Sequence, residues 1–447
     1  MCANLCVTEM LFMLTRGISR ASPLLRTMAR PASSAPSWLQ PPRSSTSEEL
    51  LLLEHKYGAP IYRPVPVILD RGEGVFVWDV EGHQYYDFLS ACSSLNHGHR
   101  HPHILAALHA QTSKLTQTSR AFHNSLLGLY EEYICTLFGY NKVLPANTGT
   151  EGGETACKLA RSWAYRVKGV PKYRAKIIFA HGNFWGRTMA AFSSSSDVSS
   201  TGDFGPFMPG FQLIPYNDIP GLERALQDPH TAAFMVEPIQ GDGGVVVPDP
   251  GYLIQIRQLC NKYNVLWIAD EVQTGMGRTG RRLAVDHENV RPDILILGKS
   301  LSGGVYPVSA VLCDDHIMST IRVGQYGSTF GGNPVACCVA MAALQVMEDE
   351  KLAENAAVMG QILHKGLSKL PKDIVKEVRG RGLLQGLVIR ETKDWDAWKV
   401  CLRLRDNGLL AKNTSHGSVI RLAPPLIIKE HEMQECVDII QRTIMSF

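Results

Sequence analysis

Short apolar runs in the middle of the chain are the feature that most constrains its fold. Each run is four or five residues long, which suits a strand but is too short for a helix, and longer segments with helical periodicity separate the runs. Strands that alternate with helices predict an α/β fold with a mainly parallel sheet, in which each strand is buried on both faces. The runs are residues 176–180, 232–236, 265–269, 294–297 and 308–312.

Charged residues follow three of these runs. Glu237 comes directly after the second run, Asp270 and Glu271 come directly after the third, and Lys299 follows the fourth after a single glycine. In open α/β sheets, ligands bind outside the carboxyl ends of the strands. We therefore expect these side chains to meet at one edge of the sheet and to form one site.

The two ends of the chain are expected to form a second, smaller α+β domain. Alternating runs at 75–78 and 84–88 predict a hairpin, and an apolar stripe near the C-terminus predicts a helix. The residues of the stripe are Met433, Val437, Ile440 and Ile444. The expected boundaries are 45–92 for the N-terminal part of the small domain, 93–339 for the large domain and 340–447 for the C-terminal part of the small domain.

Residues 1–44 have the composition of a mitochondrial transit peptide and its linker. They are rich in Arg and Ser and poor in acids. The alternatives are a disordered tail and a secretory signal. Residues 1–47 hold five Arg and one acid, whereas the whole chain has a net charge of only +3. The remainder is therefore nearly neutral and lacks the excess of basic residues that nucleic-acid binding requires. The chain also lacks an uncharged apolar stretch long enough for a membrane span. From the composition of residues 1–44 we expect a protein of the mitochondrial matrix.

Two further patterns indicate rival classes of protein. Residues 275–280 match G-x-G-x-x-G after a strand, as in dinucleotide-binding dehydrogenases, but only 13 residues separate Gly280 from Ile294, too few for a crossover helix. Four alternating histidines suggest zinc, but Pro102 interrupts them and no carboxylate or cysteine has supporting spacing. The four are His97, His99, His101 and His103. The 11 cysteines include no C-x-x-C pair, which indicates a reducing compartment, and we expect no metal site.

Lys299 is the strongest candidate for chemistry. It lies between an apolar strand and the flexible glycines of residues 298–304. A buried ammonium must be paired, neutralised or covalently used, because burying it alone is too costly. An imine with the aldehyde of pyridoxal phosphate (PLP) meets that requirement and creates a site that stabilises a carbanion. A surface lysine on a loop is the alternative.

Other residues fit the same cofactor. Asp270 ends a buried strand and needs a cation, which is either a protonated pyridine nitrogen or a structural partner such as Arg278. Residues 147–151 open a helix whose free N–H groups suit a phosphate. Phe184 can stack on a flat ring, although a core aromatic is the alternative, and Arg187 offers a fork for a substrate carboxylate.

Taken together, several motifs resemble those of the class III, fold-type I PLP-dependent aminotransferases. They are NTGTE at 147–151, EPIQG at 237–241, ADEVQTG at 269–275, LGK at 297–299 and GSTFGGNP at 327–334. Within that class, four stretches are most similar to the members that act on ornithine. These are KYGA at 56–59, GNFWGRT at 182–188, FGPFMPG at 204–210 and DWDAWK at 394–399. The resemblance covers residues 46–447.

The resemblance implies how the cofactor is held. Lys299 would bind PLP covalently and carry the transferred proton, and Asp270 would pair with the pyridinium nitrogen. Phe184 would stack on the ring, and Gln273 would donate a hydrogen bond to the ring hydroxyl. The phosphate would be held by Gly149 and Thr150 of one subunit and by Thr329 of the other, with Ser328 in the same cofactor-binding set. The family is therefore expected to form a homodimer with shared sites.

The resemblance also implies transfer of the δ-amino group of ornithine to 2-oxoglutarate. Tyr62 and Arg187 would grip the ornithine carboxylate, while Arg421 would be masked by an acid until 2-oxoglutarate enters. The masking acid of the ornithine-specific members is a glutamate, but this chain has Asp242, which is shorter by one C–C bond or about 1.5 Å.

A second departure is Cys92, which stands where those members usually carry a tyrosine that helps to orient ornithine. The change leaves 4-aminobutyrate, lysine and N-acetylornithine open as alternative donors. A non-catalytic binding protein on the same fold is a further alternative, and the intact set of Lys299, Asp270 and Arg187 argues against it.

Overall fold

The structure, a computed structural model, describes residues 46–415 and 417–447. The chain divides into two compact units, Met1–Arg63 and Pro64–Phe447. The transit peptide expected at residues 1–44 lies outside the described residues.

In the first unit, the described part is built around helix α3 (Ser47–Tyr57). The helix begins in a capping box: the Thr46 hydroxyl accepts from the Glu49 N–H at 3.3 Å, and the Glu49 carboxylate accepts from the Thr46 N–H at 3.1 Å. Acidic residues in its first turn and basic residues in its last turn complement the helix dipole. Tyr62 follows this helix and belongs to the same unit.

The second unit contains a seven-stranded sheet in the order β4-β10-β9-β8-β7-β5-β6. Strands β6, β5, β7, β8 and β9 pair in parallel, and β10 runs antiparallel to both of its neighbours. The predicted α/β fold with a mainly parallel sheet is therefore confirmed, and β5, β7, β8, β9 and β10 lie within one residue of the predicted runs. The strands are β4 (Lys142–Ala146), β5 (Lys176–Ala180), β6 (Phe211–Ile214), β7 (Thr231–Val236), β8 (Leu266–Asp270), β9 (Ile294–Leu297) and β10 (Ser309–Cys313).

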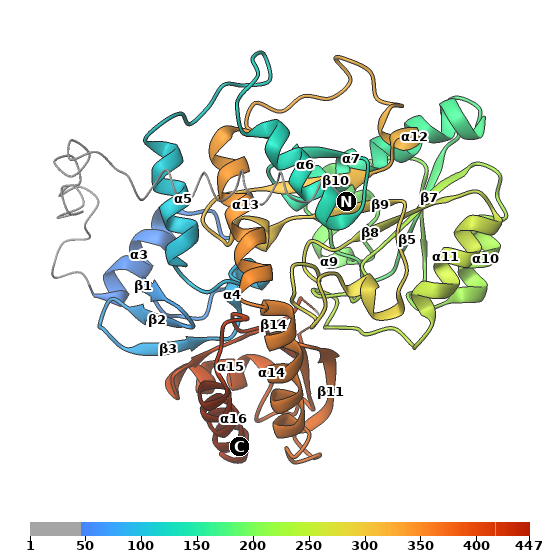
Figure 1. Ribbon diagram of the computed structural model, residues 1–447. Coiled ribbons are helices and arrows are strands. Elements are labelled where there is room, and N and C mark those ends of the chain that lie inside the picture. The colour runs from blue at the N-terminus through green and yellow to red at the C-terminus, as the bar shows by residue number, and fades with distance from the viewer. Residues whose placement is uncertain (1–45, 416) are drawn as a thin grey trace, which may run out of the picture. The chain divides into compact units, whose positions relative to one another are not determined.

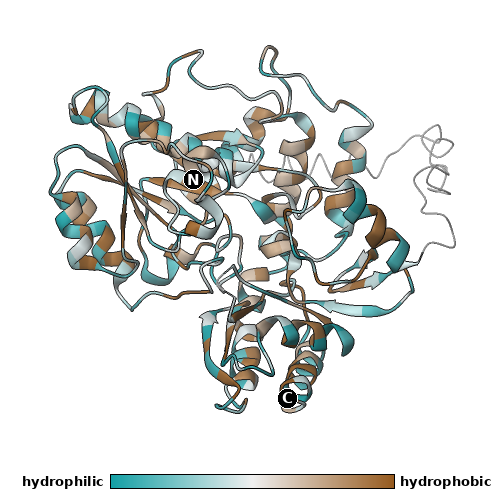
Figure 2. Cartoon of the chain, turned by 180° about the vertical axis from the view of Figure 1, so that it is seen from behind, coloured by the Kyte–Doolittle hydropathy of each residue, from teal (hydrophilic) through white to brown (hydrophobic). Residues whose placement is uncertain are grey.

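Each central strand sends alternate side chains into two separate apolar cores. In β9, Ile294 and Ile296 belong to one core while Leu295 and Leu297 belong to the other. Helix α7 (Gly149–Trp163) contributes to the first core, and α11 (Tyr252–Lys262) and α13 (Pro334–Asp349) contribute to the second. In Figure 2 the outer helices alternate between hydrophobic and hydrophilic residues, as helices with one buried face do.

Further helices connect or flank these elements. Helices α14, α15 and α16 lie together, apart from the central sheet (Figure 1). The remaining helical elements are α4 (Ser90–Ser93), α5 (Pro102–Thr112), α6 (Leu127–Phe138), η2 (Ala164–Lys168), α8 (Met189–Ser193), α9 (Val198–Thr201), α10 (Ile219–Leu226), η3 (Ala284–Glu288), η4 (Lys299–Ser302), α12 (Asp315–Met318), α14 (Leu352–Leu367), α15 (Ala397–Asp406) and α16 (Glu430–Met445).

Two small four-stranded sheets complete the second unit. One has the order β1-β2-β3-β13 and the other has the order β11-β12-β15-β14. The predicted hairpin is confirmed as β2 and β3, and the predicted C-terminal helix is confirmed as α16, whose apolar stripe is buried. The domain boundaries at 92/93 and 339/340 stay predictions. The strands are β1 (Leu69–Glu73), β2 (Phe76–Asp79), β3 (Gln84–Asp87), β11 (Val375–Arg381), β12 (Leu384–Ile389), β13 (Leu409–Leu410), β14 (Lys412–Asn413) and β15 (Val419–Leu422).

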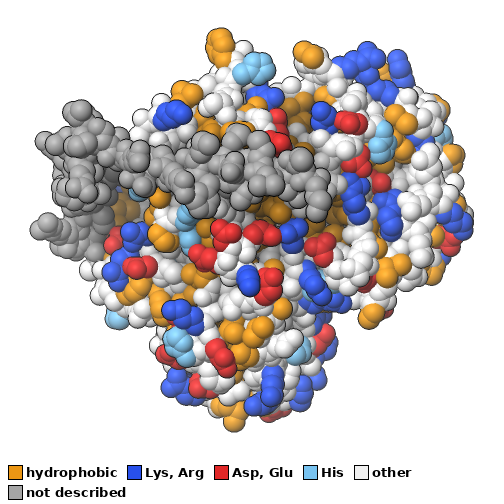
Figure 3. Space-filling view, viewed as in Figure 1, with side chains coloured by type: hydrophobic (Ala, Val, Ile, Leu, Met, Phe, Trp, Pro, Cys, Tyr) orange, Lys and Arg blue, Asp and Glu red, His pale blue; other side chains and the backbone are white. Residues whose placement is uncertain are grey.

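The surface of the described residues has a mixed character. On the face drawn in Figure 3, acidic and basic side chains are interspersed over much of the area. Among the described residues, every helix is too short or too polar to cross a bilayer.

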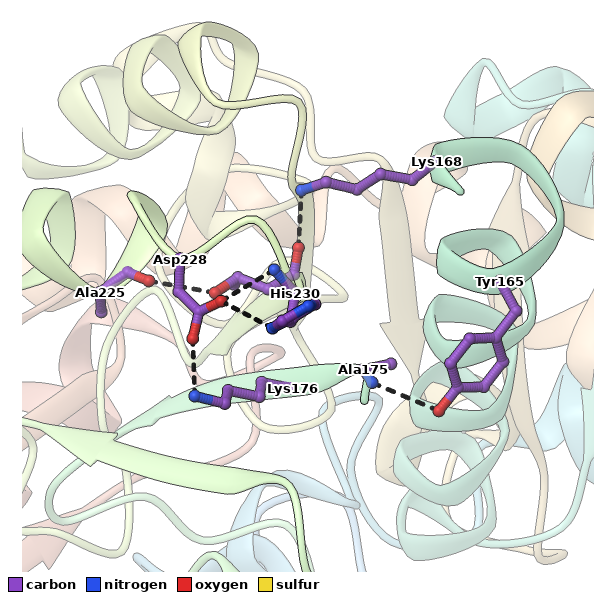
Figure 4. A network of polar contacts seen from close by, with 8 residues as sticks. Tyr165, Lys168, Ala175, Lys176, Ala225, Asp228 and His230 are labelled. Carbon is purple, nitrogen blue, oxygen red and sulfur yellow. Dashed lines mark hydrogen bonds and ion pairs between the residues drawn. The ribbon is translucent and has the colours of Figure 1, made fainter. Parts of the chain in front are cut away.

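A polar network fixes the amino ends of β5 and β7, at the edge of the sheet opposite to their carboxyl ends (Figure 4). Asp228 accepts hydrogen bonds from the Lys176 ammonium at 2.6 Å and from the His230 N–H at 2.9 Å. Lys168 donates to the Thr231 carbonyl at 2.7 Å. The hydrogen bond from Lys176 is the largest of the effects that lower the pKa of Asp228 below its usual value. The ionised carboxylate therefore contributes to stability.

We expect Asp228→Asn to lower the free energy of unfolding at neutral pH by about 0.5–1 kcal/mol, because the amide cannot pair with Lys176. The folded-state pKa lies below the unfolded value of 3.8, so this contribution is present above pH 4 and is lost as the pH falls through the folded pKa. Thermal unfolding at several pH values tests this, with Asp203→Asn at an exposed aspartate as the control. An equal difference at pH 7 and pH 3 would contradict it.

Candidate active site

The carboxyl ends of β7, β8 and β9 bring three charged residues to one edge of the sheet. Residues Val236 and Ala269 are paired across β7 and β8, and Asp270 is paired with Ile296 across β8 and β9. Glu237, Asp270 and Lys299 consequently lie close enough to influence one another's ionisation. The expected gathering of these residues is confirmed. Glu271 does not join them, because its carboxylate accepts hydrogen bonds from the Thr274 hydroxyl and the Val285 N–H instead.

Lys299 occupies a strained position at the start of η4. Its φ of 46° lies in the left-handed region, which is unfavourable for a residue with a side chain, and such strain clusters at functional sites. Removal from water lowers the pKa of its ammonium, and the charge of Arg421 adds to that effect. The environment therefore favours the neutral amine, which is the nucleophilic form.

Asp270 is a buried carboxylate that is only partly satisfied. It is 5% exposed, and one oxygen accepts a hydrogen bond from the Val272 N–H at 3.0 Å. No described residue donates to its other oxygen. Burial raises the pKa of Asp270 to about 6, against the opposing effects of that N–H and of Lys299. A carboxylate in this state fits a protonated pyridine nitrogen, which would restore its charge and fill the vacant acceptor.

Arg278, the structural alternative, does not pair with Asp270. Its guanidinium donates to the Leu383 carbonyl at 2.9 Å, the Pro424 carbonyl at 2.5 Å and Asn96 Oδ1 at 2.5 Å. This arginine therefore ties together three distant segments, and the carboxylate of Asp270 remains available for another cation.

The start of α7 has the capped, open helix N-terminus that the sequence predicts there. Thr148 caps the helix by accepting from the Glu151 N–H at 3.1 Å, and the Glu151 carboxylate accepts from the Thr148 N–H at 2.8 Å. The N–H groups of Gly149 and Thr150 have no partner among the described residues, so they can bind a phosphate. A Cβ at Gly149 would lie 2.8 Å from Val272 Cγ1, which explains the glycine. Gly149 and Lys299 line one pocket of about 390 Å³.

The sequence placed Glu237 at this edge without assigning it a role, and it did not single out Val272. Glu237 is buried and accepts hydrogen bonds from the N–H groups of Phe184 at 3.1 Å and Gly241 at 3.4 Å. It thereby fixes the loop that carries Phe184. Val272 packs between Gly149 and Gly298. Val272 lies two residues after the end of β8, and that position is the signal that could have identified it.

Phe184, Arg187 and Asp242 line a second, smaller pocket. The Arg187 guanidinium lies 5.7 Å from the centroid of the Phe184 ring and has no hydrogen bond or ion pair with a described residue. Its fork is thus free for a carboxylate. The Asp242 carboxylate accepts a hydrogen bond from the Ser415 hydroxyl at 2.5 Å. The ion pair between Asp242 and Arg421 that the masking role requires is not formed in this structure.

Arg421, on β15, is buried with neutral partners. It is 5% exposed and donates to Gln273 Oε1 at 2.6 Å and to Cys92 Sγ at 2.9 Å, whereas its Nε has no partner. Because arginine can only donate, the amide oxygen of Gln273 must face it. The amide nitrogen of Gln273 is then left to donate, as the expected contact with a ring hydroxyl requires.

Cys92 is held in place by an unusual turn. Four successive residues, 90–93, have φ values of 47°, 46°, 58° and 70°, all in the left-handed region. The Asp87 carboxylate accepts from the N–H groups of Leu89 at 2.9 Å and Ser90 at 2.8 Å, which stabilises the start of this turn. The turn directs the Cys92 sulfur toward Arg421.

The other predicted residues lie outside the Lys299 pocket. Ser328 Oγ accepts from Asn147 Nδ2 at 3.0 Å, which places Ser328 beside the loop before α7. Thr329 is exposed and does not line the pocket of Lys299 in its own subunit. Tyr62 belongs to the unit Met1–Arg63 and is 69% exposed. Its contact with substrate stays a prediction.

Three of the four alternating histidines have different structural partners. His97 contacts the Ala343 carbonyl at 2.9 Å, His99 contacts Asp87 at 2.8 Å and His101 contacts Glu350 at 3.0 Å. Among the described residues, the group with metal-ligand geometry is Asp79, Glu81 and His83 in the β2–β3 turn. Asp79 already accepts hydrogen bonds there from His83 and Tyr85.

Comparisons with known proteins agree with this geometry. The family described as aminotransferase class-III matches residues 57–444. The mitochondrial ornithine aminotransferase of Rattus norvegicus is 65% identical over 95% of this chain and 96% of its own length. That of Drosophila melanogaster is 63% identical over 90% of this chain and 93% of its own length.

Solved structures agree as well. The ornithine aminotransferase of Toxoplasma gondii ME49 superposes with a TM-score of 0.88 at 47% identity, covering 90% of this chain and 96% of its own. The acetylornithine aminotransferase of Elizabethkingia anophelis superposes with a TM-score of 0.83 at 54% identity, covering 90% of this chain and 100% of its own. These matches and the site at the sheet edge lead to one conclusion: the chain belongs to the class-III aminotransferases, on the PLP-dependent fold-type I scaffold.

Proposed function

We propose that the chain transfers the δ-amino group of L-ornithine to 2-oxoglutarate, which yields L-glutamate 5-semialdehyde and L-glutamate. Pyridoxal 5'-phosphate is the cofactor. The observation that carries the proposal is the pair of incompletely satisfied charges at the sheet edge, Lys299 and Asp270, beside the open N-terminus of α7. The relatives named ornithine aminotransferase support the choice of donor.

Residues of this chain hold the cofactor and tune its chemistry. When bound, PLP supplies an electron sink for the carbon that loses its proton. Lys299 binds the cofactor covalently and carries the proton between two carbons, and burial, which lowers the pKa of its ammonium, assists this role. Asp270 keeps the pyridine nitrogen protonated. Phe184 stacks on the ring, and Gln273 donates to the ring hydroxyl.

The phosphate of the cofactor is held across two subunits. The free N–H groups of Gly149 and Thr150 bind it in one subunit. Thr329, which is exposed and does not line its own Lys299 pocket, reaches the phosphate of a second subunit, with Ser328 beside it. We propose a homodimer on this basis, with a small domain built from residues 45–92 and 340–447 and a large domain of residues 93–339. The mitochondrial names of the relatives support a mitochondrial protein, and we place it in the matrix.

The substrate residues must accept a cationic donor and then a dianionic acceptor. Arg187 binds the carboxylate of ornithine together with Tyr62. Arg421 binds the second carboxylate of 2-oxoglutarate, and Asp242 can approach it only by leaving Ser415. In this structure the Arg421 guanidinium donates hydrogen bonds to Gln273 and Cys92 instead.

N-acetylornithine is the second candidate for the donor. The observation that favours it is the 54% identity to the acetylornithine aminotransferase of Elizabethkingia anophelis, together with Cys92. A thiol leaves more room and less polarity than a phenol, so it fits a neutral acylated amine better than a tyrosine would. Lysine and 4-aminobutyrate remain further alternatives.

The donor preference can be measured directly. We expect kcat/KM with 2-oxoglutarate to be highest for ornithine among ornithine, N-acetylornithine, lysine and 4-aminobutyrate. Lys299→Ala supplies the inactive reference, since the variant lacks the amine that binds the cofactor. A preference of tenfold or more for another donor, about 1.4 kcal/mol of transition-state binding, would overturn the choice of ornithine and leave the class of reaction standing.

Asp270→Asn is expected to retain the cofactor and to lose about 10²–10³-fold in kcat, because a neutral amide cannot keep the pyridine nitrogen protonated. The Phe184 and α7 contacts remain in the variant and should preserve cofactor binding. Measuring the cofactor content and the turnover of the same preparation tests both the retention of cofactor and the loss of rate. If the variant loses the cofactor but turns over normally once PLP is added, Asp270 acts only through structure.

Cys92→Tyr is expected to raise kcat/KM for ornithine relative to 4-aminobutyrate by about 2- to 13-fold, the value of one hydrogen bond of about 0.5–1.5 kcal/mol. The phenol would supply a polar contact for the donor that the thiol lacks. Cys92→Ser is the matched control, because it keeps a small side chain beside Arg421. An unchanged donor ratio in Cys92→Tyr, with folding intact, would show that position 92 does not set the preference.

A further inference from the structure

A groove of about 790 Å³ lies away from the residues assigned to the aminotransferase site. Three segments line it: the stretch from Thr279 to His287, helix α14 and the turn between β11 and β12. Its volume is in the range of pockets for small molecules. No residue that we assign to cofactor or substrate lines it.

The floor of the groove is rigid because backbones meet there without side chains between them. A Cβ at Gly382 would lie 2.4 Å from the Thr279 carbonyl carbon, and a Cβ at Gly360 would lie 2.3 Å from the Gly382 oxygen. Gly382 also has a φ of 53°, which favours glycine. The neighbouring residues Arg281 and Arg381 are therefore held at defined positions on the two sides of this contact.

The charge of the groove is positive and unpaired. Arg281, Arg381 and Lys365 line it, and none of them forms an ion pair or a side-chain hydrogen bond with a described residue. Glu354 is the one acidic residue among the lining residues. Burial and the charges of Arg381 and Arg281 lower the pKa of His287, which places both guanidinium groups near that ring. Uncompensated guanidinium groups that converge on a cavity provide the forked donors that phosphate groups bind.

Two histidines in the groove keep one ring nitrogen available. His287 Nε2 lies 3.1 Å from the Thr279 carbonyl, which can only accept, so that nitrogen carries the proton. Gln385 Nε2 donates to the Gly382 carbonyl, so its Oε1 accepts from His364 Nδ1 at 3.0 Å. Each ring is thus oriented through one nitrogen, and the other nitrogen has no hydrogen-bond partner among the described residues.

We propose that this groove binds the diphosphate group of a small molecule, with Arg281 and Arg381 gripping the anion from its two sides. Lys365 supplies a further donor, and the rings of His287 and His364 line the groove beside it. The apolar side chains of Ala357 and Val358 on α14 form a wall against which a nucleoside could lie. The ligand would connect the loop after β8 with the β11–β12 turn.

Calorimetric titration of the holoenzyme with sodium pyrophosphate tests the proposal. At constant ionic strength we expect one site per chain, with binding weakened at least about tenfold in the double variant Arg281→Gln/Arg381→Gln. Arg174→Gln, at an exposed arginine without a described partner, is the matched control. Transaminase activity shows that the variants are folded, because neither arginine belongs to the active site.

The outcomes are distinct. ADP that binds more tightly than pyrophosphate assigns the site to nucleotides, and ADP that binds equally or less tightly assigns it to free diphosphate; both results support a diphosphate site. Loss of binding in Arg187→Gln but not in the double variant would place the anion in the substrate site and overturn the proposal. Absence of binding, or equal competition by sulfate, would overturn it as well. Lys365→Glu, on the exposed face of α14, is an independent variant that serves if the double variant fails to fold. We expect it to weaken pyrophosphate binding as well.

Discussion

The desolvation of charged groups at the carboxyl edge of the central sheet is the constraint on which the site depends. Strands β7, β8 and β9 are buried on both faces, so the residues that follow them leave water when the sheet forms. Glu237 accepts hydrogen bonds from two N–H groups and Asp270 from one, whereas the Lys299 amine has no hydrogen-bond acceptor among the described residues. The folded protein therefore holds incompletely satisfied charges in fixed positions, and a cationic ring with an aldehyde and a phosphate matches them.

The parts of the structure that depend on local sequence could be predicted. Short apolar runs identify buried strands because no other element hides both faces in four or five residues. Asp270 and Lys299 could then be found because each follows such a run. The reversed direction of β10 could not be found in this way, since a strand buried on both faces has the same composition in either orientation. Glu237 carried the same signal as Asp270, although its partners in the Phe184 loop become visible only in the fold.

Contacts between distant segments are the parts that sequence reasoning missed. Asp242 was expected at the position that masks Arg421, with a side chain too short for easy direct pairing, and only the fold shows that it binds Ser415 instead. The left-handed turn at residues 90–93 contains no glycine and so gives no local sign of its conformation. Its strain is tolerated because Asp87 caps the first N–H groups of the turn. Arg278, read as a possible partner of Asp270, instead donates to two carbonyls and an amide oxygen.

The contact between Cys92 and Arg421 also has a consequence for the order of folding. The two residues are 329 positions apart, and β3 near the N-terminus acquires its parallel neighbour β13 only from residues 409–410. Loop closure of this length slows folding, and a chain that emerges from the ribosome at its N-terminus first cannot complete the substrate pocket until nearly all of it has been synthesised. Until residues 409–410 have been made, one edge of β3 lacks its neighbouring strand. The topology therefore makes completion of the substrate pocket one of the last events in the synthesis of the chain.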